Sequence, residues 1–263
     1  MATIHSDIQA YLLQQRQMYG DILYTDAVAY DASLVLAPDE APRPQQKDES
    51  HHQQSAPNQH QVEHGGHVKT DRQIVAAFDA ESMIDFNDAI KECLKCPLGF
   101  TRTNFVFGSG NPNADLMIIG EAPGADEDEQ GLPFVGRAGQ LLTKILEAVE
   151  FNRDDVYICN ILKCRPPNNR KPLASETDTC EPYLRKQIDL VQPRFILALG
   201  LTAANTLLKN KESMTSLRGR MHDYHGIPTL VTYHPAALLR NPEWKKHTWE
   251  DVQHLKSLFT NGA

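Results

Sequence analysis

The sequence predicts an α/β protein, a three-layer α/β/α arrangement around a central four-stranded parallel sheet. Short apolar runs typical of buried strands alternate with segments whose apolar residues recur every three or four positions, as on one face of a helix. Such alternation favours a parallel sheet covered by helices on both faces. The expected strands are 115–119, 156–160, 194–199 and 229–232, and the expected helices are 74–78, 84–94, 137–150, 173–191, 201–209 and 245–259.

The chain before this domain has a different composition. Residues 1–36 are expected to form an N-terminal helical segment, because 6–23 read as an amphipathic helix that Ser6 and Gln9 begin with a capping box. Residues 37–70 are rich in Pro, Gln, His, Ser and Gly and are expected to form a disordered linker. The compact domain is therefore expected at 71–263.

The net charge of −8 is distributed unevenly. Residues 1–90 hold 5 Lys and Arg against 14 Asp and Glu, whereas residues 91–263 hold 21 against 20. The domain can thus carry a local basic face, and the acidic average does not exclude a nucleic-acid partner. No apolar run approaches the roughly 20 residues that span a bilayer, and the N-terminus lacks the pattern of a signal peptide. We expect a cytoplasmic protein without membrane contact, and a monomer.

Polar or flexible residues follow the strands where each ends. Glu121, Asn160, Gly200 and His234 stand at or just after the four strand ends, which would converge at one edge of the sheet. The loop 120–139 after the first strand adds glycines, carboxylates and Phe134. A single His or Asn at such a place is more often structural, but Glu121, Asn160 and His234 together with Phe134 predict a pocket.

The chemistry of this set suits a flat polar ring. An Asn amide offers both donors and an acceptor, which matches the O4 and N3–H edge of uracil. Phe134 can stack on the ring, and His234 can donate to a carbonyl oxygen that gains negative charge. A base lies inside the duplex, so an enzyme of this kind must flip it out.

Three motifs carry a family resemblance over roughly residues 86–260. They are Gly120-Glu121-Ala122-Pro123-Gly124 continuing to Gly139, Cys159-Asn160-Ile161-Leu162-Lys163-Cys164-Arg165-Pro166-Pro167, and His234-Pro235-Ala236-Ala237-Leu238-Leu239-Arg240-Asn241-Pro242. The chain resembles the family 4 uracil-DNA glycosylases, the iron–sulfur members of their superfamily. The resemblance implies removal of uracil from DNA by hydrolysis of the N-glycosidic bond, leaving an abasic site.

The resemblance also implies residue roles. Phe134 would stack on uracil, Asn160 would read it, His234 would lie near O2, and Glu121 would position or activate the water. Glu127 would line the C5 side of the base. The family 1 pattern Gly-Gln-Asp-Pro-Tyr is not matched, because Ala122 replaces its Asp and Gly124 its Tyr. The identity of the water-activating group therefore stays open.

The segment after His234 is implied to contact DNA. Leu238 and Leu239 would enter the gap that a flipped base leaves, and Arg240 would hold a phosphate. The alternative is that the two leucines begin a buried helix. Further candidates for phosphate contacts are Lys163, Arg165, Arg170, Lys171, Arg218, Arg220, Lys245 and Lys246.

Cys93, Cys96, Cys164 and Cys180 form a possible metal-ligand set. Four thiolates suit either zinc or an iron–sulfur cubane, and spacing does not separate them. The family resemblance implies a [4Fe–4S] cluster. Cys159 lies within a strand and is expected to be a buried small hydrophobe.

Two other classes of function remain as alternatives. A nucleotide-binding or redox enzyme is disfavoured, because no Gly-x-Gly-x-x-Gly follows the first strand and no Walker lysine is present. A superfamily relative could bind uracil-containing DNA, or capture the abasic site covalently, without turnover. Covalent relatives carry a basic insert with a His, and 163–180 contains no His, which favours hydrolysis.

Overall fold

The computed structural model describes residues 77–261. The helix expected at 6–23 and the linker expected at 37–70 lie outside the described residues, as does most of the helix expected at 74–78. None of the helices in the described range is long and apolar enough to cross a membrane.

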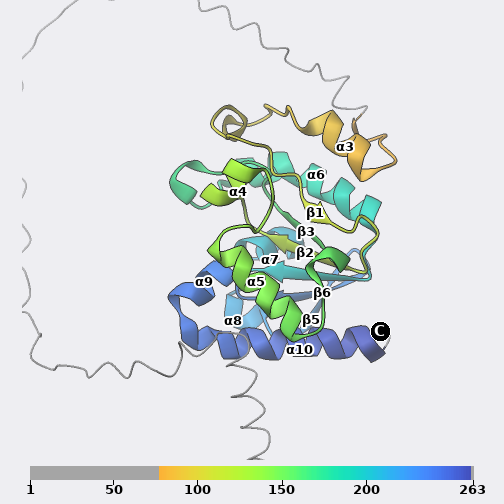
Figure 1. Ribbon diagram of the computed structural model, residues 1–263, viewed down its shortest axis with the longest axis vertical. Helices are drawn as coiled ribbons and strands as arrows, with labels where there is room; N and C mark the ends of the chain where they lie inside the picture. The colour runs from red at the N-terminus through yellow and green to blue at the C-terminus, as the bar shows by residue number, and fades with distance from the viewer. Residues whose placement is uncertain (1–76, 262–263) are drawn as a thin grey trace, which may run out of the picture. The chain divides into compact units, whose positions relative to one another are not determined.

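A six-stranded sheet forms the centre of the domain, in the order β1-β3-β2-β4-β6-β5 (Figure 1). Its middle four strands pair in parallel and are the four that the sequence predicts, which confirms the α/β class. The two outer strands pair antiparallel and extend the expected sheet on both edges. The strands are β1 Ser109–Gly110, β2 Leu116–Gly120, β3 Tyr157–Asn160, β4 Phe195–Leu199, β5 Met221–Tyr224 and β6 Ile227–Thr232.

The two edge strands have little signal in the sequence. β1 is two residues long, and β5 carries the sequence Met-His-Asp-Tyr, in which no apolar alternation is visible. A two-residue turn joins β5 to β6, and both His225 and Gly226 have positive φ there, 51° and 87°. This conformation matches the twist of an antiparallel hairpin.

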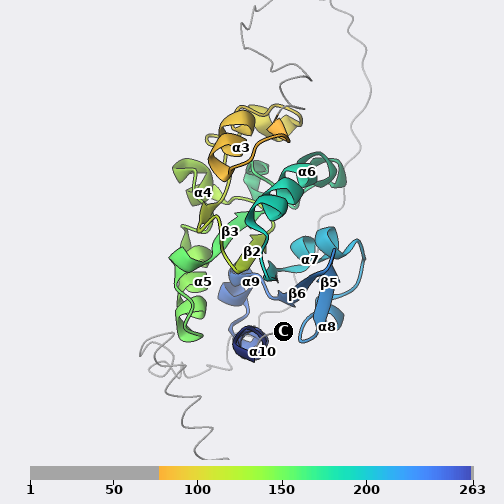
Figure 2. The same ribbon diagram turned by 90° about the vertical axis from the view of Figure 1, so that its right-hand side faces the viewer.

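Helices cover both faces of the sheet (Figure 2). On one face, α6 and α7 pack on side chains such as Ile119, Ile196 and Val231 in one hydrophobic cluster. On the other face lie α5 and α10, where the Phe259 ring lies 5.7 Å from that of Phe195. The helices are α3 Met83–Ile90, α4 Ala125–Gln130, α5 Arg137–Ala148, α6 Ala174–Val191, α7 Leu201–Leu208, α8 Met214–Leu217, α9 Pro235–Arg240 and α10 Lys245–Asn261. Short 3-10 turns lie at Pro97–Phe100, Arg153–Asp155, Pro167–Asn169 and Pro242–Trp244.

The carboxyl ends of the parallel strands meet at one edge, as in other open α/β sheets. β2 leads into the loop that contains α4, and β6 leads directly into α9. Both α4 and α9 are six residues long, too short for a helical period to stand out in the sequence. These two short helices carry much of the candidate site.

Candidate active site

One pocket of about 360 Å³ opens at the carboxyl edge of the sheet. All three segments that carry the sequence motifs contribute to this pocket. They are the loop after β2, the end of β3 and the start of α9. Its lining includes Glu121, Glu127, Phe134, Asn160, His234 and Arg240. The volume is within the range of small-molecule sites.

Asn160 ends β3 with its side chain buried, at 1% exposure. Its Oδ1 has no hydrogen-bond partner among the described residues. An unpaired buried acceptor costs about 1–3 kcal/mol, so this oxygen is suited to receive an N–H from a ligand in the pocket. The Asn160 carbonyl accepts a hydrogen bond of 2.7 Å from Lys163 Nζ, which fixes the end of the strand.

Gly120 makes room for Asn160 and Phe134. It is the last residue of β2 and lies opposite Asn160 in the parallel register. A Cβ at this position would lie 2.5 Å from Phe134 Cζ and would overlap Asn160 Oδ1. The glycine therefore lets the ring and the amide approach the strand end together.

Phe134 is held in an unusual backbone conformation. Its φ of 53° is left-handed, which is uncommon for a bulky residue and typical of functional sites. The ring is 5% exposed and its centroid lies 5.5 Å from that of His234. Arg153 Nη2 donates to the preceding carbonyl, that of Pro133, at 2.8 Å. The backbone next to Phe134 is thus held in place, and the ring forms an aromatic wall of the pocket.

Glu127 lines the pocket, but backbone N–H groups use both of its carboxylate oxygens. Oε1 accepts from Val135 and Gly136 at 2.9 and 3.0 Å, and Oε2 accepts from Gly124 at 3.1 Å. The carboxylate ties the two halves of the loop 120–139 on either side of Phe134. This arrangement makes Glu127 a positioning residue for the loop, and its contact with the C5 side of the base stays a prediction.

His234 caps the N-terminus of α9, and this fixes its tautomer. Nδ1 accepts a hydrogen bond of 3.2 Å from the Ala236 N–H. Burial, together with the nearby Arg240 charge, lowers the pKa of His234 to about 4. At neutral pH the ring is therefore uncharged and carries its proton on Nε2. Nε2–H has no partner among the described residues and is free to donate to a ligand.

Glu121 follows β2 and faces the pocket with a carboxylate that is partly buried. Within the described part of the chain, no hydrogen bond or ion pair engages that carboxylate. Its backbone carbonyl accepts the Leu162 N–H at 3.1 Å, which extends the pairing of β2 with β3. The free carboxylate is suited to hold a water molecule.

The two leucines of α9 differ sharply in environment. Leu238 is fully buried, whereas Leu239 is 40% exposed. The helical turn directs Leu238 into the core, as in the alternative of a buried helix, and leaves Leu239 at the surface. Entry of a leucine into the gap left by a flipped base stays a prediction. Arg240 is exposed at the pocket rim.

Three of the expected phosphate-binding cations have hydrogen-bond or ion-pair partners within the protein. Lys163 is 0% exposed and also donates to Gln187 Oε1 at 2.5 Å. Arg170 forms an ion pair of 2.6 Å with Glu176, and Arg218 one of 2.9 Å with Asp251. The prediction of phosphate contact is wrong for Lys163, whose buried ammonium instead supports the strand that ends at Asn160.

The four candidate ligand cysteines gather around one hydrophobic cluster. Cys164 and Cys180 belong to it, and Cys93 and Cys96 pack against it. Burial raises the pKa of the Cys164 thiol to about 11 and that of Cys180 to about 12. Cys159 lies apart from this set, fully buried in β3 and packed in the larger cluster under α6 and α7.

Donors point at the sulfur atoms of this cluster. Arg102 Nη1 donates to Cys164 Sγ at 3.2 Å and to the Cys93 carbonyl at 2.6 Å. The Tyr183 hydroxyl donates to Cys93 Sγ at 3.3 Å. Such donors support thiolate ligands.

Between residues 77 and 261, no three His, Cys, Asp or Glu side chains converge closely enough to hold one metal ion. Four thiolates with these donors are a ligand set that suits zinc as well as an iron–sulfur cluster.

Comparison with known proteins gives consistent matches. The family model described as the uracil DNA glycosylase superfamily matches residues 107–255, which include every residue of the pocket lining. A Type-4 uracil-DNA glycosylase of Thermotoga maritima is 44% identical over 183 residues, 68% of this chain and 95% of that protein. That of Pyrobaculum aerophilum is 45% identical over 176 residues, 63% and 89%. That of Sulfurisphaera tokodaii is 41% identical over 187 residues, 68% and 85%.

Proposed function

The chain belongs to the uracil DNA glycosylase superfamily, and from that premise we propose that it excises uracil from DNA. The enzyme flips uracil out of the strand and hydrolyses its N-glycosidic bond, leaving an abasic site. The observation that carries the proposal is the buried, unpaired Asn160 Oδ1 beside the free Nε2–H of His234 in one pocket.

Asn160 supplies the selection of the base. Its Oδ1 accepts from uracil N3–H while its amide N–H donates to O4. Cytosine presents an acceptor at N3 and a donor at the exocyclic amine, so both contacts would be mismatched. Because mismatched buried polar groups cost several kcal/mol together, cytosine is rejected strongly. Phe134 stacks on the ring and excludes water from that side.

His234 contributes to catalysis by stabilising the departing base. Cleavage passes through an oxocarbenium-like sugar while negative charge develops on the departing base. A preoriented Nε2–H at O2 stabilises that charge in a site with little water, which is worth about 3–4 kcal/mol for one well-placed donor. The depressed pKa of His234 means that this donor is a neutral imidazole. It therefore donates a hydrogen bond and keeps its proton.

Glu121 orients the attacking water. Its carboxylate lies in the same pocket and has no internal partner among the described residues. Since the position after Glu121 is Ala122, no second carboxylate adjoins it there. The oxocarbenium character of the sugar makes a strong base unnecessary.

The surrounding surface binds the DNA. Arg240 at the pocket rim contacts a phosphate, and Leu239 fills the gap in the base stack. Cys93, Cys96, Cys164 and Cys180 hold a [4Fe–4S] cluster, which anchors the segment between Cys164 and Cys180. That segment contributes Pro166, Asn169 and Arg170 to the pocket wall. A monomer in the cytoplasm stays a prediction.

The experiment is release of free uracil from uracil-containing single- and double-stranded oligonucleotides. We expect His234→Ala and Asn160→Ala each to slow release at least tenfold. Asn113→Ala and His254→Ala change the same residue types away from the pocket and serve as controls with unchanged rates. Near wild-type rates for both pocket variants would refute the site, and a crosslinked adduct without free uracil would favour covalent capture.

A further inference from the structure

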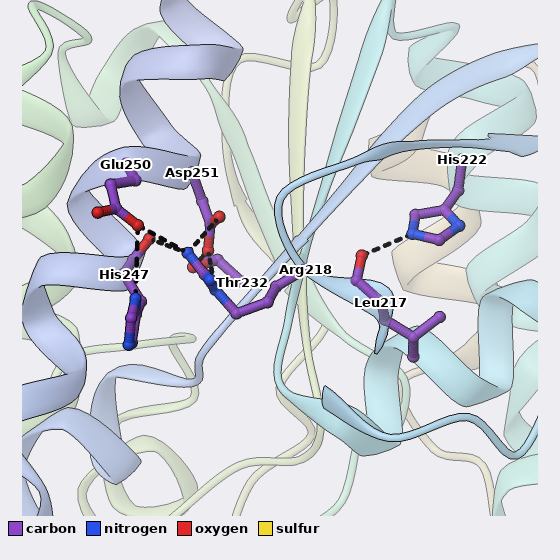
Figure 3. A network of polar contacts seen from close by, with 7 residues as sticks. All are labelled: Leu217, Arg218, His222, Thr232, His247, Glu250 and Asp251. Carbon is purple, nitrogen blue, oxygen red and sulfur yellow. Dashed lines mark hydrogen bonds and ion pairs between the residues drawn. The ribbon is translucent and has the colours of Figure 1, made fainter. Parts of the chain in front are cut away.

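A buried carboxylate lies behind the strand that leads to His234. Asp251 on α10 is 1% exposed, and all its partners are donors (Figure 3). Thr232 Oγ1 donates to its Oδ2 at 2.7 Å. Arg218 donates from Nε to Oδ2 at 3.2 Å and from Nη2 to Oδ1 at 2.9 Å. The two-point contact of the guanidinium fixes the carboxylate in orientation as well as position.

Arg218 is itself held in place from α10. Its Nη2 donates to the His247 carbonyl at 2.8 Å and to Glu250 Oε2 at 3.3 Å (Figure 3). Glu250 is half exposed, so its contact with Arg218 contributes little. The buried part of the network is thus the chain of contacts from Arg218 through Asp251 to Thr232.

Thr232 stands at a sensitive place in the fold. It is the last residue of β6, two positions before His234, and its carbonyl accepts the Gly200 N–H at 2.8 Å. Tyr233, the residue between them, stacks on Trp244 with ring centroids 4.7 Å apart. The backbone that delivers His234 is therefore fixed on both sides before α9 begins.

The contacts of His234 leave it little freedom once that backbone is fixed. Its Nδ1 is bound by the Ala236 N–H, and its ring lies against Phe134. A Cβ on Gly200 would meet His234 Cβ at 3.0 Å, so the end of β4 packs closely against it. A shift of the end of β6 would therefore move His234 Nε2 as well. Errors of about 1 Å in the positions of reacting groups cost roughly a hundredfold in rate.

We propose that Asp251, oriented by Arg218, is a positioning residue that sets His234 through the Thr232 hydroxyl. This inference rests on the proposed uracil excision, and it identifies the residues that hold His234, the hydrogen-bond donor to the departing base. A purely mechanical link between α10 and the sheet does not need a charge, because well-packed apolar residues serve as well as a buried ion pair. The carboxylate instead gives a fixed acceptor at the strand end next to His234.

The test is Thr232→Val in the full chain with its metal content intact, with Thr232→Ser as the conservative variant. Single-turnover uracil release is measured well below each melting temperature, together with affinity for an oligonucleotide that carries an abasic site. We expect Thr232→Val to slow release about tenfold, the equivalent of one lost hydrogen bond. Affinity for the abasic product should change less than twofold. Thr232→Ser and the control Glu250→Gln should keep the wild-type rate.

A double-mutant comparison separates positioning from general damage. In a His234→Ala background, Thr232→Val should slow release less than twofold further, because the residue that it positions is gone. An equal tenfold loss in that background would overturn the inference, and so would a wild-type rate for Thr232→Val alone. If the wild-type protein released no uracil, the proposed function itself would fail, which is a different result.

Discussion

Gly120→Ala places a single methyl group against Phe134 and Asn160, the two residues that we propose to contact the base. A Cβ there would lie 2.5 Å from Phe134 Cζ and would overlap Asn160 Oδ1. Carbon atoms in contact stay about 3.5–4.0 Å apart, so the ring or the amide must move by about 1 Å. A displacement of that size at a reacting geometry costs roughly a hundredfold in rate. The overpacking should also cost about 1–3 kcal/mol in stability.

The assay is single-turnover uracil release at a temperature where the variant is fully folded. Gly226→Ala is the control, because a Cβ there meets nothing within 4 Å and the turn is remote from the pocket. Its φ of 87° predicts a loss of stability of about 1 kcal/mol without a loss of rate. A Gly120→Ala rate within threefold of wild type would show that the pocket tolerates the methyl group and would exclude this role of Gly120.

The remaining predictions concern charge, loop order and the cysteine set. Because the pKa of His234 falls to about 4 in the folded protein against 6.5 unfolded, the unfolded chain binds the extra proton between these values. Stability should therefore be complete above about pH 6.5 and fall by about 3 kcal/mol as pH drops to 4. Urea titrations against His234→Ala measure this difference, and an NMR midpoint of His234 near 6.5 would contradict it. Arg240→Gln should weaken DNA binding and reduce the salt slope by about 1, and it should raise the pKa of His234; an unchanged slope would exclude a phosphate contact. Glu127→Gln should lower the free energy of unfolding by about 2 kcal/mol, since one amide cannot accept all three backbone N–H bonds; a neutral effect would remove Glu127 as the support of the loop. Arg102→Ala should weaken retention of a cluster at least about tenfold against a chelator, followed by absorption near 400 nm in anaerobically purified protein. A colourless wild-type protein with stoichiometric zinc would instead refute the cluster.

The sheet could be predicted because its central strands are apolar on both faces. β2 and β4 are buried along their whole length, and such runs stand out in a sequence. β5 could not be predicted, because it is an edge strand with one buried residue, Tyr224. Its place depends on pairing with β6, which is a tertiary contact.

The pocket could be predicted from the residues at the strand ends, but the contacts and burial of each residue could not. Glu127 lies in a run of four acidic residues, and only the fold shows which carboxylate faces the loop backbone. Lys163 reads as a surface cation in the sequence and is fully buried in the structure. Leu238 and Leu239 are identical in type and adjacent, and the helical turn of α9 decides which one enters the core.

The role of Gly120 was also hidden in the sequence. A glycine at a strand end has many explanations, including turn conformation and simple tolerance. Here the reason is the close approach of Phe134 and Asn160 from two other segments. Neither segment is near Gly120 in the chain, so no local pattern reports the contact.

We propose that the pocket holds a flipped uracil while the enzyme hydrolyses its glycosidic bond. The most direct measurement is the product of incubation with matched oligonucleotides that contain uracil or thymine at one position. We expect free uracil and an abasic strand from the first and no reaction with the second, with the activity reduced at least tenfold by Asn160→Ala. Release of neither base would contradict the proposal. So would an Asn160→Ala variant that releases uracil as fast as the wild-type protein.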